Sequence, residues 1–334
     1  MLKFIARRLL LLAPILFGLS LITFAFVRSL LPGLPAQELL GDRDRRDRAV
    51  TVEDPSADGS VWVQYARYVG HVARGELGYS ETSGREVGEE LTDRLPASAE
   101  LALVASTLAL VLGVWIGSLA ARREGGLMDR GSVFLSLVGI SFPFFVLALF
   151  LRYAIGIELG WLPGAGRLEV AAQVDHPTNL YILDAIVTLD PSTLLNALKH
   201  IVLPAIALGA IPLAVIMRST RSATVRVLDE GYVRTAEAKG LDQGVVDRRH
   251  ILRNAILPVI GAMGPQIGLL MAGLVLTEPV FSWDGLGSWM FEAIAQRDYA
   301  VVHAGLLTAA VIVVIGKLAL EVLNAFLDPR IRYP

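Results

Sequence analysis

The chain has 334 residues, of which 54% are hydrophobic and 19% are charged, and its mean hydropathy is +0.56. A soluble domain of this size needs more polar surface, so the composition predicts an integral membrane protein. The formal net charge of −2 argues against a nucleic-acid-binding protein. Because cysteine is absent, disulfides, thiolate metal ligands and cysteine nucleophiles are excluded.

The N-terminus carries Lys3, Arg7 and Arg8, followed by an apolar run from Leu9 to Val27. A basic start before an apolar run resembles a secretory signal sequence. This run is longer than a usual signal core, and no small-x-small cleavage site follows it. We therefore predict a retained first helix, with cleavage as the alternative.

Six segments are long and apolar enough to cross a bilayer, whose hydrocarbon core requires about 20 residues per helix. They cover approximately residues 9–31, 98–121, 131–157, 200–217, 255–279 and 300–326. The predicted fold is an all-α integral membrane protein with six transmembrane helices and a large extracytoplasmic loop at 32–97.

Orientation follows from the basic residues of the short loops, which favour the cytoplasm. Arginine and lysine gather at the N-terminus, at 122–130, at 218–254 and in the tail, whereas the loops between them are mainly acidic. Both termini and the segment 218–254 are therefore predicted to be cytoplasmic.

Aromatic residues mark the predicted outer boundary. Trp62, Tyr65, Val69 and Val72 recur at helical spacing, which predicts a short amphipathic helix. This helix either lies on the outer leaflet or packs against the bundle. The indole rings of three further tryptophans are expected at the headgroup level: Trp161, Trp283 and Trp289.

Several prolines fall inside the predicted spans, where they remove a backbone hydrogen bond and favour kinks. They are Pro143, Pro204, Pro212 and Pro265. Such kinks either shape a gate or serve packing alone.

Catalytic and nucleotide-binding motifs are not found. The five histidines form no His-Glu-x-x-His pair, and no lysine is followed by the Ser or Thr that a phosphate-binding loop requires. We therefore predict no catalytic residue, metal site or cofactor site in this chain. Lys317 and Glu321 lie one turn apart in the last span, as either a structural pair or an ion relay.

The segment 218–254 has the features of a docking loop. Asp229 is expected to cap a short helix that carries small residues at Thr235 and Ala236 and ends at a left-handed Gly240. Asp242 is expected to cap a second helix. Small side chains would let the groove of another protein approach the backbone, and the alternative is an ordinary basic loop.

At these residues the chain resembles the oligopeptide/dipeptide/nickel permease family of ABC importers, as the first of the paired permeases. The cytoplasmic signature reads Arg234-Thr-Ala-Glu-Ala-Lys-Gly240, followed by Leu252-Arg-Asn-Ala-Ile-Leu-Pro258. Other stretches match in order along the chain: Gly75-Glu-Leu-Gly-Tyr-Ser80, Arg94-Leu-Pro-Ala-Ser-Ala-Glu-Leu101, Leu159-Gly-Trp-Leu-Pro163, Glu278-Pro-Val-Phe-Ser-Trp-Asp-Gly-Leu-Gly287 and Asp328-Pro-Arg-Ile-Arg-Tyr333. The chain departs from the family pattern at Leu34, Asp284 and Lys317.

The resemblance implies a type I ABC importer-like permease in the bacterial plasma (inner) membrane. Its implied partners are a second permease, two cytoplasmic ATPase subunits that bind ATP and Mg²⁺, and an extracytoplasmic substrate-binding protein. Peptides are the implied cargo, with nickel, glutathione or another small solute as alternatives, and a secondary carrier as a further rival. The substrate-binding residues stay unknown. The implied ATPase-coupling residues are Arg234, Thr235, Ala236, Glu237, Lys239, Gly240, Asp242, Arg253 and Pro258.

Overall fold

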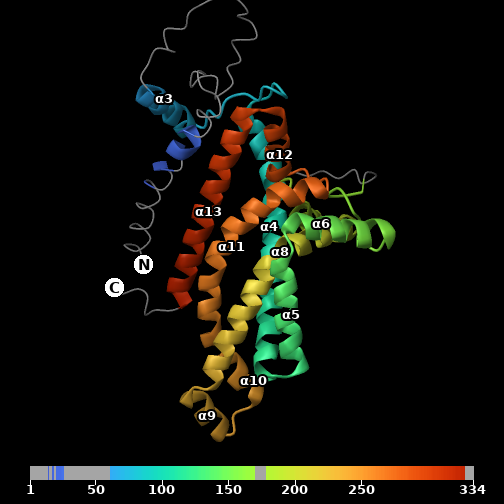
Figure 1. The fold of residues 1–334 in the computed structure, drawn as a ribbon, viewed down its shortest axis with the longest axis vertical. Helices are drawn as coiled ribbons and strands as arrows, with labels where there is room; N and C mark the ends of the chain where they lie inside the picture. Colours follow the sequence, from blue (N-terminus) through green and yellow to red (C-terminus); the bar gives the residue numbers. More distant parts are fainter. Residues whose placement is uncertain (1–13, 15–16, 19, 26–60, 170–177, 328–334) are drawn as a thin grey trace, which may run out of the picture. The chain divides into compact units, whose positions relative to one another are not determined.

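The computed structural model is mainly helical in the part of the chain that it describes, which is residues 14, 17–18, 20–25, 61–169 and 178–327 (Figure 1). Most of the predicted first span and the loop 26–60 therefore lie outside the described residues. Residues 20–25 are helical, and the other elements are α3 (Val61–Ala73), α4 (Val87–Arg122), α5 (Leu127–Ser141), α6 (Phe144–Leu151), η2 (Arg152–Glu158), α7 (Tyr181–Val187), α8 (Pro191–Leu228), α9 (Gly231–Ala238), α10 (Gln243–Val245), η3 (Val246–Leu252), α11 (Arg253–Val280), α12 (Leu286–Gln296) and α13 (Tyr299–Leu327).

Four of these helices are long and apolar enough to cross a membrane. They are α4, α8, the continuous run of α10, η3 and α11, and α13. The pair α5 and α6–η2 is a fifth candidate, bent by 104°. The chain is thus a multi-pass membrane protein, and the prediction of six spans stays a prediction.

The prolines act differently at different positions. The chain leaves helical geometry at Phe142 and Pro143, which separate α5 from α6, so the expected kink is a full break. Helices α8 and α11 continue through Pro204, Pro212 and Pro265. A proline therefore breaks only one of these three predicted spans.

The chain divides into two compact units, and each is described by itself. The first contains residues up to Ser98 together with Asp284–Val314. In this unit the Tyr65 ring of α3 packs edge-on against Phe24, with the ring centroids 5.4 Å apart, and Val69 and Val72 adjoin the contact. The alternative that α3 packs against neighbouring helices therefore holds for this face, whereas Trp62 is exposed.

Polar contacts fix the outer elements of the first unit. The Asp298 carboxylate accepts hydrogen bonds from the Ser80 hydroxyl at 2.6 Å and from the backbone N–H of Val301 at the start of α13 at 3.3 Å. The Trp289 indole donates to Glu90 at 2.8 Å, and both side chains are buried. The prediction that Trp289 faces the headgroups is therefore wrong, because its polar N–H has a protein partner inside the unit.

The second unit contains Ala99–Trp283 and residues from Ile315 onward, and α8 lies at its centre. Glycines permit close packing: a Cβ at Gly117 of α4 would lie 2.5 Å from the Met217 carbonyl of α8, and one at Gly209 would lie 3.0 Å from the Ala105 carbonyl. Small residues let membrane helices approach in this way. Asp190 caps the start of α8 by accepting from the backbone N–H groups of Ser192 and Thr193.

Candidate functional site: a knob at the end of α8

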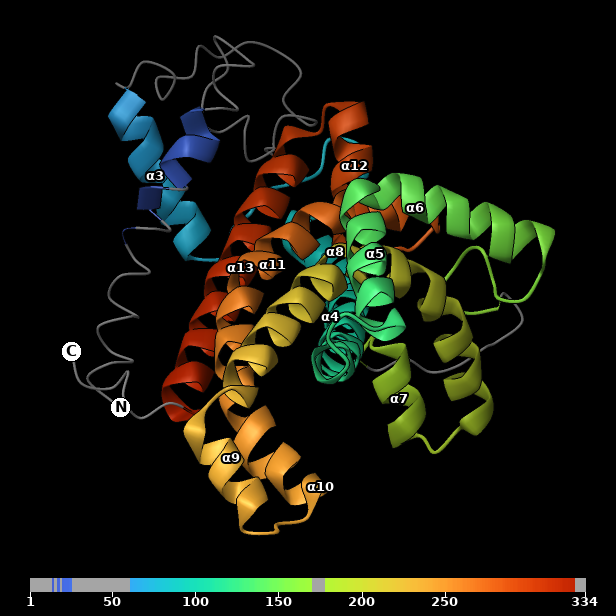
Figure 2. The ribbon, with the colours of Figure 1, turned by 60° about the horizontal axis from the view of Figure 1, so that its bottom comes forward.

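The sequence between α8 and α11 folds into a compact projection, which we call the knob (residues 230–252). Figure 2 shows α9 and α10 extending beyond the end of α8. Helix α9 follows α8 after a two-residue turn, whereas η3 continues into α11 without a break. The knob is thus joined to two long helices, by a turn on one side and by continuous helix on the other.

A small apolar core holds the knob together. Val233 and Ala236 of α9 are buried against Val246 and Ile251 of η3. Val227 and Leu228, from the last turn of α8, pack on the same cluster. Because α9, η3 and the last turn of α8 all contribute to this core, the knob is a folded unit and not an extended loop.

Turns and caps in the knob follow the predicted pattern with one exception. Gly240 has φ +73°, in the left-handed region that glycine adopts without a steric penalty. The Asp242 carboxylate accepts from the Gly244 N–H at 2.9 Å and so caps α10. The prediction that Asp229 caps α9 is wrong: Glu230 holds the N-cap position, and Asp229 ends α8.

Most of the predicted coupling residues lie on the surface of the knob or at the start of α11. The exposed ones are Arg234, Thr235, Glu237, Lys239, Gly240, Asp242, Arg253 and Pro258. The Thr235 hydroxyl is turned back onto its own helix and donates to the Gly231 carbonyl at 2.8 Å. Ala236 differs from the rest because it is buried, so its small side chain lets η3, and not a partner, approach α9.

Apolar side chains are also exposed on the knob. They are Tyr232, Leu241, Val245 and Leu252. Asn254 donates to the Tyr232 hydroxyl at 3.0 Å and to the His250 carbonyl at 2.8 Å, which orients the Tyr232 ring. A surface of exposed apolar groups among basic ones is suited to contact with another protein.

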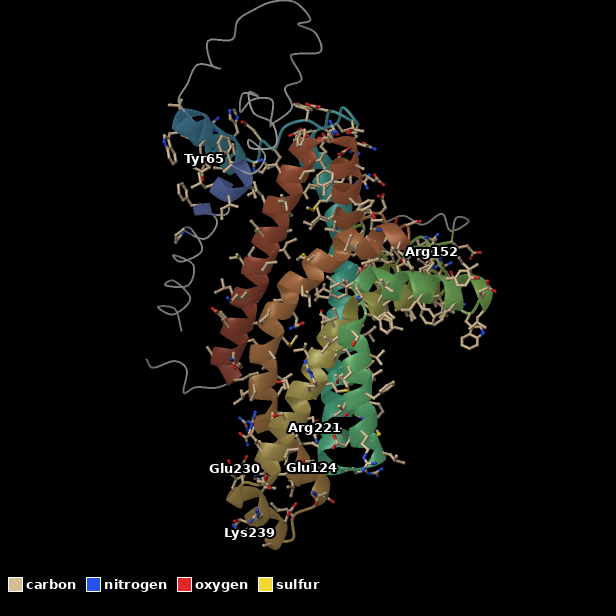
Figure 3. All side chains as sticks on the ribbon, viewed as in Figure 1. Tyr65, Glu124, Arg152, Arg221, Glu230 and Lys239 are labelled. Carbon is tan, nitrogen blue, oxygen red and sulfur yellow. The ribbon has the colours of Figure 1, made fainter. Side chains whose placement is uncertain are left out.

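Charged contacts connect this end of the unit to the turn between α4 and α5. Arg122, the last residue of α4, donates to Asp247 of η3. Arg221 of α8 forms a two-pronged contact with Asp129 of α5, in which its Nη2 lies 2.8 Å from Oδ2. Figure 3 labels Arg221 and Glu124; Nη2 of Arg221 lies 3.7 Å from Oε1 of Glu124. Sequence reasoning used these arginines only to predict orientation, because nothing local indicates their acidic partners.

A second charged cluster lies at the other end of α8, and we call it the Arg167 cluster (Glu100, Arg167, Asn179, Tyr181 and Trp283). Arg167 donates to Glu100 at 3.0 Å and to the Asn179 carbonyl at 2.7 Å. Its guanidinium lies 3.7 Å from the centre of the Tyr181 ring and 5.5 Å from that of Trp283. The side chains of Arg167 and Glu100 are 8% and 7% exposed, so this is a buried ion pair covered by aromatic rings.

The Arg167 cluster brings together stretches that lie far apart in the sequence. Glu100 comes from the stretch 94–101 and Trp283 from 278–287, and Arg167 follows the stretch 159–163 after three residues. The backbone N–H of Gly166 also donates to the Phe281 carbonyl at 2.8 Å. Trp283 is fully buried here, so the prediction that it faces the headgroups is wrong.

The described part of the chain thus combines long apolar helices with a folded, exposed knob. A family model for the binding-protein-dependent transport system inner membrane component matches residues 113–333, and the chain belongs to this family. This match confirms the family that the sequence resembles. The chain is a permease component and a multi-pass membrane protein.

Curated relatives that match over the full chain include two dipeptide-type permeases and a glutathione permease. The di/tripeptide transport system permease protein DppB of Pseudomonas aeruginosa is 43% identical over 100% of this chain and 99% of its own length. The dipeptide transport system permease protein DppB of Escherichia coli K12 is 39% identical with the same coverage. The glutathione transport system permease protein GsiC of Salmonella paratyphi A is 35% identical over 100% of both chains.

Proposed function

We propose that this chain is the permease subunit of a binding-protein-dependent ABC importer and forms half of the pathway for di- and oligopeptides. Support comes from the full-length identity of 43% to a di/tripeptide permease. Its proposed partners are a second permease, two ATPase subunits that bind and hydrolyse ATP with Mg²⁺, and an extracytoplasmic binding protein. The proposed location is the bacterial plasma membrane, with both termini and the knob in the cytoplasm.

The proposed mechanism depends on the knob. Its core of Val233, Ala236, Val246 and Ile251 is internal, so the exposed residues of α9 and η3 remain available to a partner. In the proposal, the knob seats in a groove of one ATPase subunit. The energy of ATP then reaches the pathway only through a contact that differs between two states of the ATPase pair.

A sharp test reconstitutes the chain with its candidate partners in proteoliposomes and follows uptake of a labelled dipeptide. We expect uptake that requires both ATP and the binding protein and that stops when ATP is replaced by a non-hydrolysable analogue. The Arg234→Glu/Lys239→Glu variant reverses two exposed charges, one in α9 and one at its C-cap, and should reduce the amount of ATPase that co-purifies. Asp93→Asn, an exposed change at the start of α4, is the matched control.

Two outcomes would contradict the proposal. Uptake by this chain alone, without ATP, would favour a secondary carrier. Uptake of glutathione in preference to dipeptides would favour the second candidate cargo, for which the 35% identity to a glutathione permease is the supporting observation.

A further inference from the structure

Beyond docking, the knob must pass its movement to the helices that form the pathway. Its covalent links lead only to α8 and α11. Helices α4 and α5 have no such link, although they belong to the same compact unit from Ala99 onward. The non-covalent contacts of the α4–α5 turn decide whether these two helices follow the knob.

The first such contact is the ion pair between Arg122 and Asp247. The side chains are 37% and 17% exposed, so the pair is partly shielded from solvent. Arg122 contacts Oδ2 of Asp247, whereas Oδ1 is buried and has no hydrogen-bond partner within the described part of the chain. An acceptor left without a partner is costly, so the carboxylate depends on Arg122 for its stabilisation.

The second contact is the fork between Arg221 and Asp129. A guanidinium that contacts both carboxylate oxygens fixes orientation as well as distance. Asp129 also accepts from the Gly125 N–H at 2.9 Å, so the same carboxylate holds the turn between α4 and α5 in shape. The turn is therefore attached to α8 by one ion pair and to the knob by the other.

Helix packing makes this connection stiff. A Cβ at Gly113 would lie 2.7 Å from the Ile216 side chain, and one at Gly117 would lie 2.5 Å from the Met217 carbonyl. Helix α4 therefore lies directly against α8 in the turns that precede Arg122. Small residues of this kind let the two helices pack directly against each other, so a displacement of the turn reaches α4 next to its contact with α8.

From these contacts we infer that the α4–α5 turn is a strut, in which the Arg122–Asp247 pair transmits displacement of the knob to α4 and α5. Arg122 and Asp247 are positioning residues: they touch neither the cargo nor ATP, and they act through the helices that they join. This inference rests on the proposed function, because it presupposes that an ATPase moves the knob.

The test reverses and then restores the charge pair in the complete reconstituted transporter. Arg122→Asp and Asp247→Arg are made singly and together, and two quantities are measured: ATPase subunits retained on purification, and ATP hydrolysis stimulated by the binding protein. Each single variant should retain its ATPase subunits but lose stimulation by about tenfold, a usual size for coupling between sites. The double variant should recover to within about twofold of wild type, because the pair is re-formed in reverse.

The matched control is the exposed pair Arg85–Asp93, separated by 3.0 Å, with both side chains more than half exposed. The corresponding single and double reversals should leave stimulation unchanged. Failure of the Arg122→Asp/Asp247→Arg variant to recover, with assembly intact, would overturn the strut. So would full stimulation in the single variants.

A cross-linking experiment tests the strut if charge reversal prevents assembly of the transporter. The chain has no cysteine, so Arg122→Cys/Asp247→Cys provides the only two thiols in this subunit. A reversible bis-methanethiosulfonate linker should restore stimulation in a complex with cysteine-free partners, and a reductant should abolish it again. Equal activity with and without the linker would overturn the strut, whereas a wild-type complex without any stimulation would count against the proposed function instead.

Discussion

Two ion pairs, one near each end of α8, differ in how deeply their side chains are buried. The Glu100–Arg167 pair is buried, covered by aromatic rings and supplemented by a backbone carbonyl and a backbone N–H. The Arg122–Asp247 pair is partly exposed, and one carboxylate oxygen of Asp247 has no partner among the residues that the structure describes. The first therefore holds a buried arrangement in place, whereas the second lies at a partly exposed junction between the α4–α5 turn and the knob.

Buried and exposed charges differ because water screens the exposed ones. Breaking a buried pair leaves an unpaired charge in a medium that solvates it poorly, whereas a surface pair contributes little to stability. We therefore expect changes in the Arg167 cluster and at the buried Asp129 carboxylate to reduce stability, and changes on the surface of the knob to affect function more than stability.

The largest effect is expected from Arg167→Ala. It leaves the Glu100 carboxylate buried without its guanidinium, at a cost of about 3–5 kcal/mol. Thermal unfolding of the purified complex, followed by tryptophan fluorescence, should show a clearly lower midpoint. Glu100→Gln keeps the acceptor for the Ile182 N–H, which lies 2.7 Å from Glu100, and should cost less. Equal unfolding midpoints for wild type and Arg167→Ala would show that the pair does not stabilise the folded protein.

The Asp129–Arg221 fork should give the next largest effect. Asp129→Asn removes the charge that holds the two-pronged contact and should cost about 2 kcal/mol, as for hydrogen bonds to charged groups. Arg221→Lys retains the charge but loses the fork, so it should cause part of the same loss. Unfolding midpoints in low and high salt provide the measurement. A lysine variant as stable as wild type would show that charge alone matters at this site.

Gly240→Val should alter the knob with only a local loss of stability. The valine must adopt φ +73°, at a cost of about 1–2 kcal/mol for left-handed geometry. No atom lies within 4 Å of the added Cβ, so the penalty is in the backbone and not in packing. We expect reduced binding-protein-stimulated ATP hydrolysis with the spans still inserted.

Gly240→Asn is the matched control, since asparagine tolerates this conformation, and it should behave nearly as wild type. Undiminished stimulation in Gly240→Val would exclude a role for the turn in coupling.

We expect the smallest effect on stability from the Asp190 carboxylate, and only at low pH. Hydrogen bonds from the Ser192 and Thr193 hydroxyls, at 2.6 Å each, lower the pKa of its carboxyl from 3.8 to about 2. Because the folded pKa lies below the unfolded one, the stabilisation is fully present above about pH 4 and is lost as the pH falls toward 2.

Asp190→Asn caps a helix without titrating. The difference between the unfolding midpoints of wild type and this variant should therefore shrink between pH 4 and pH 2. A difference that does not change with pH would contradict this assignment.

Local features of the fold were predictable from local sequence. Gly240 at a left-handed turn and Asp242 as a helix cap both follow from rules that act within three or four residues. Helical spacing placed Tyr65, Val69 and Val72 on one face, and the structure packs them together. The error at Asp229 arose because adjacent acidic residues are equivalent in sequence, and only the end of α8 decides which one precedes α9.

Long-range pairing was not predictable. Arg122 and Asp247 are 125 residues apart, Arg221 and Asp129 are 92 apart, and Arg167 and Glu100 are 67 apart. From the sequence alone, any basic residue near the knob could have been the ion-pair partner of each acidic residue. The tryptophans show the same limit, because Trp161 is exposed as expected at a boundary, whereas Trp283 and Trp289 are buried against polar partners.

By itself, the sequence determined a membrane protein of apolar helices, the position of the knob between two of them, and the residues that turn and cap it. These properties depend on composition and on hydrogen bonds between near neighbours. Only the tertiary structure decided that Ala236 lies inside the knob, that three separate stretches converge at Arg167, and that the α4–α5 turn is tied to η3. Such contacts depend on how closely and in which direction whole helices pack, and in α4 and α8 that approach is set by Gly113 and Gly117.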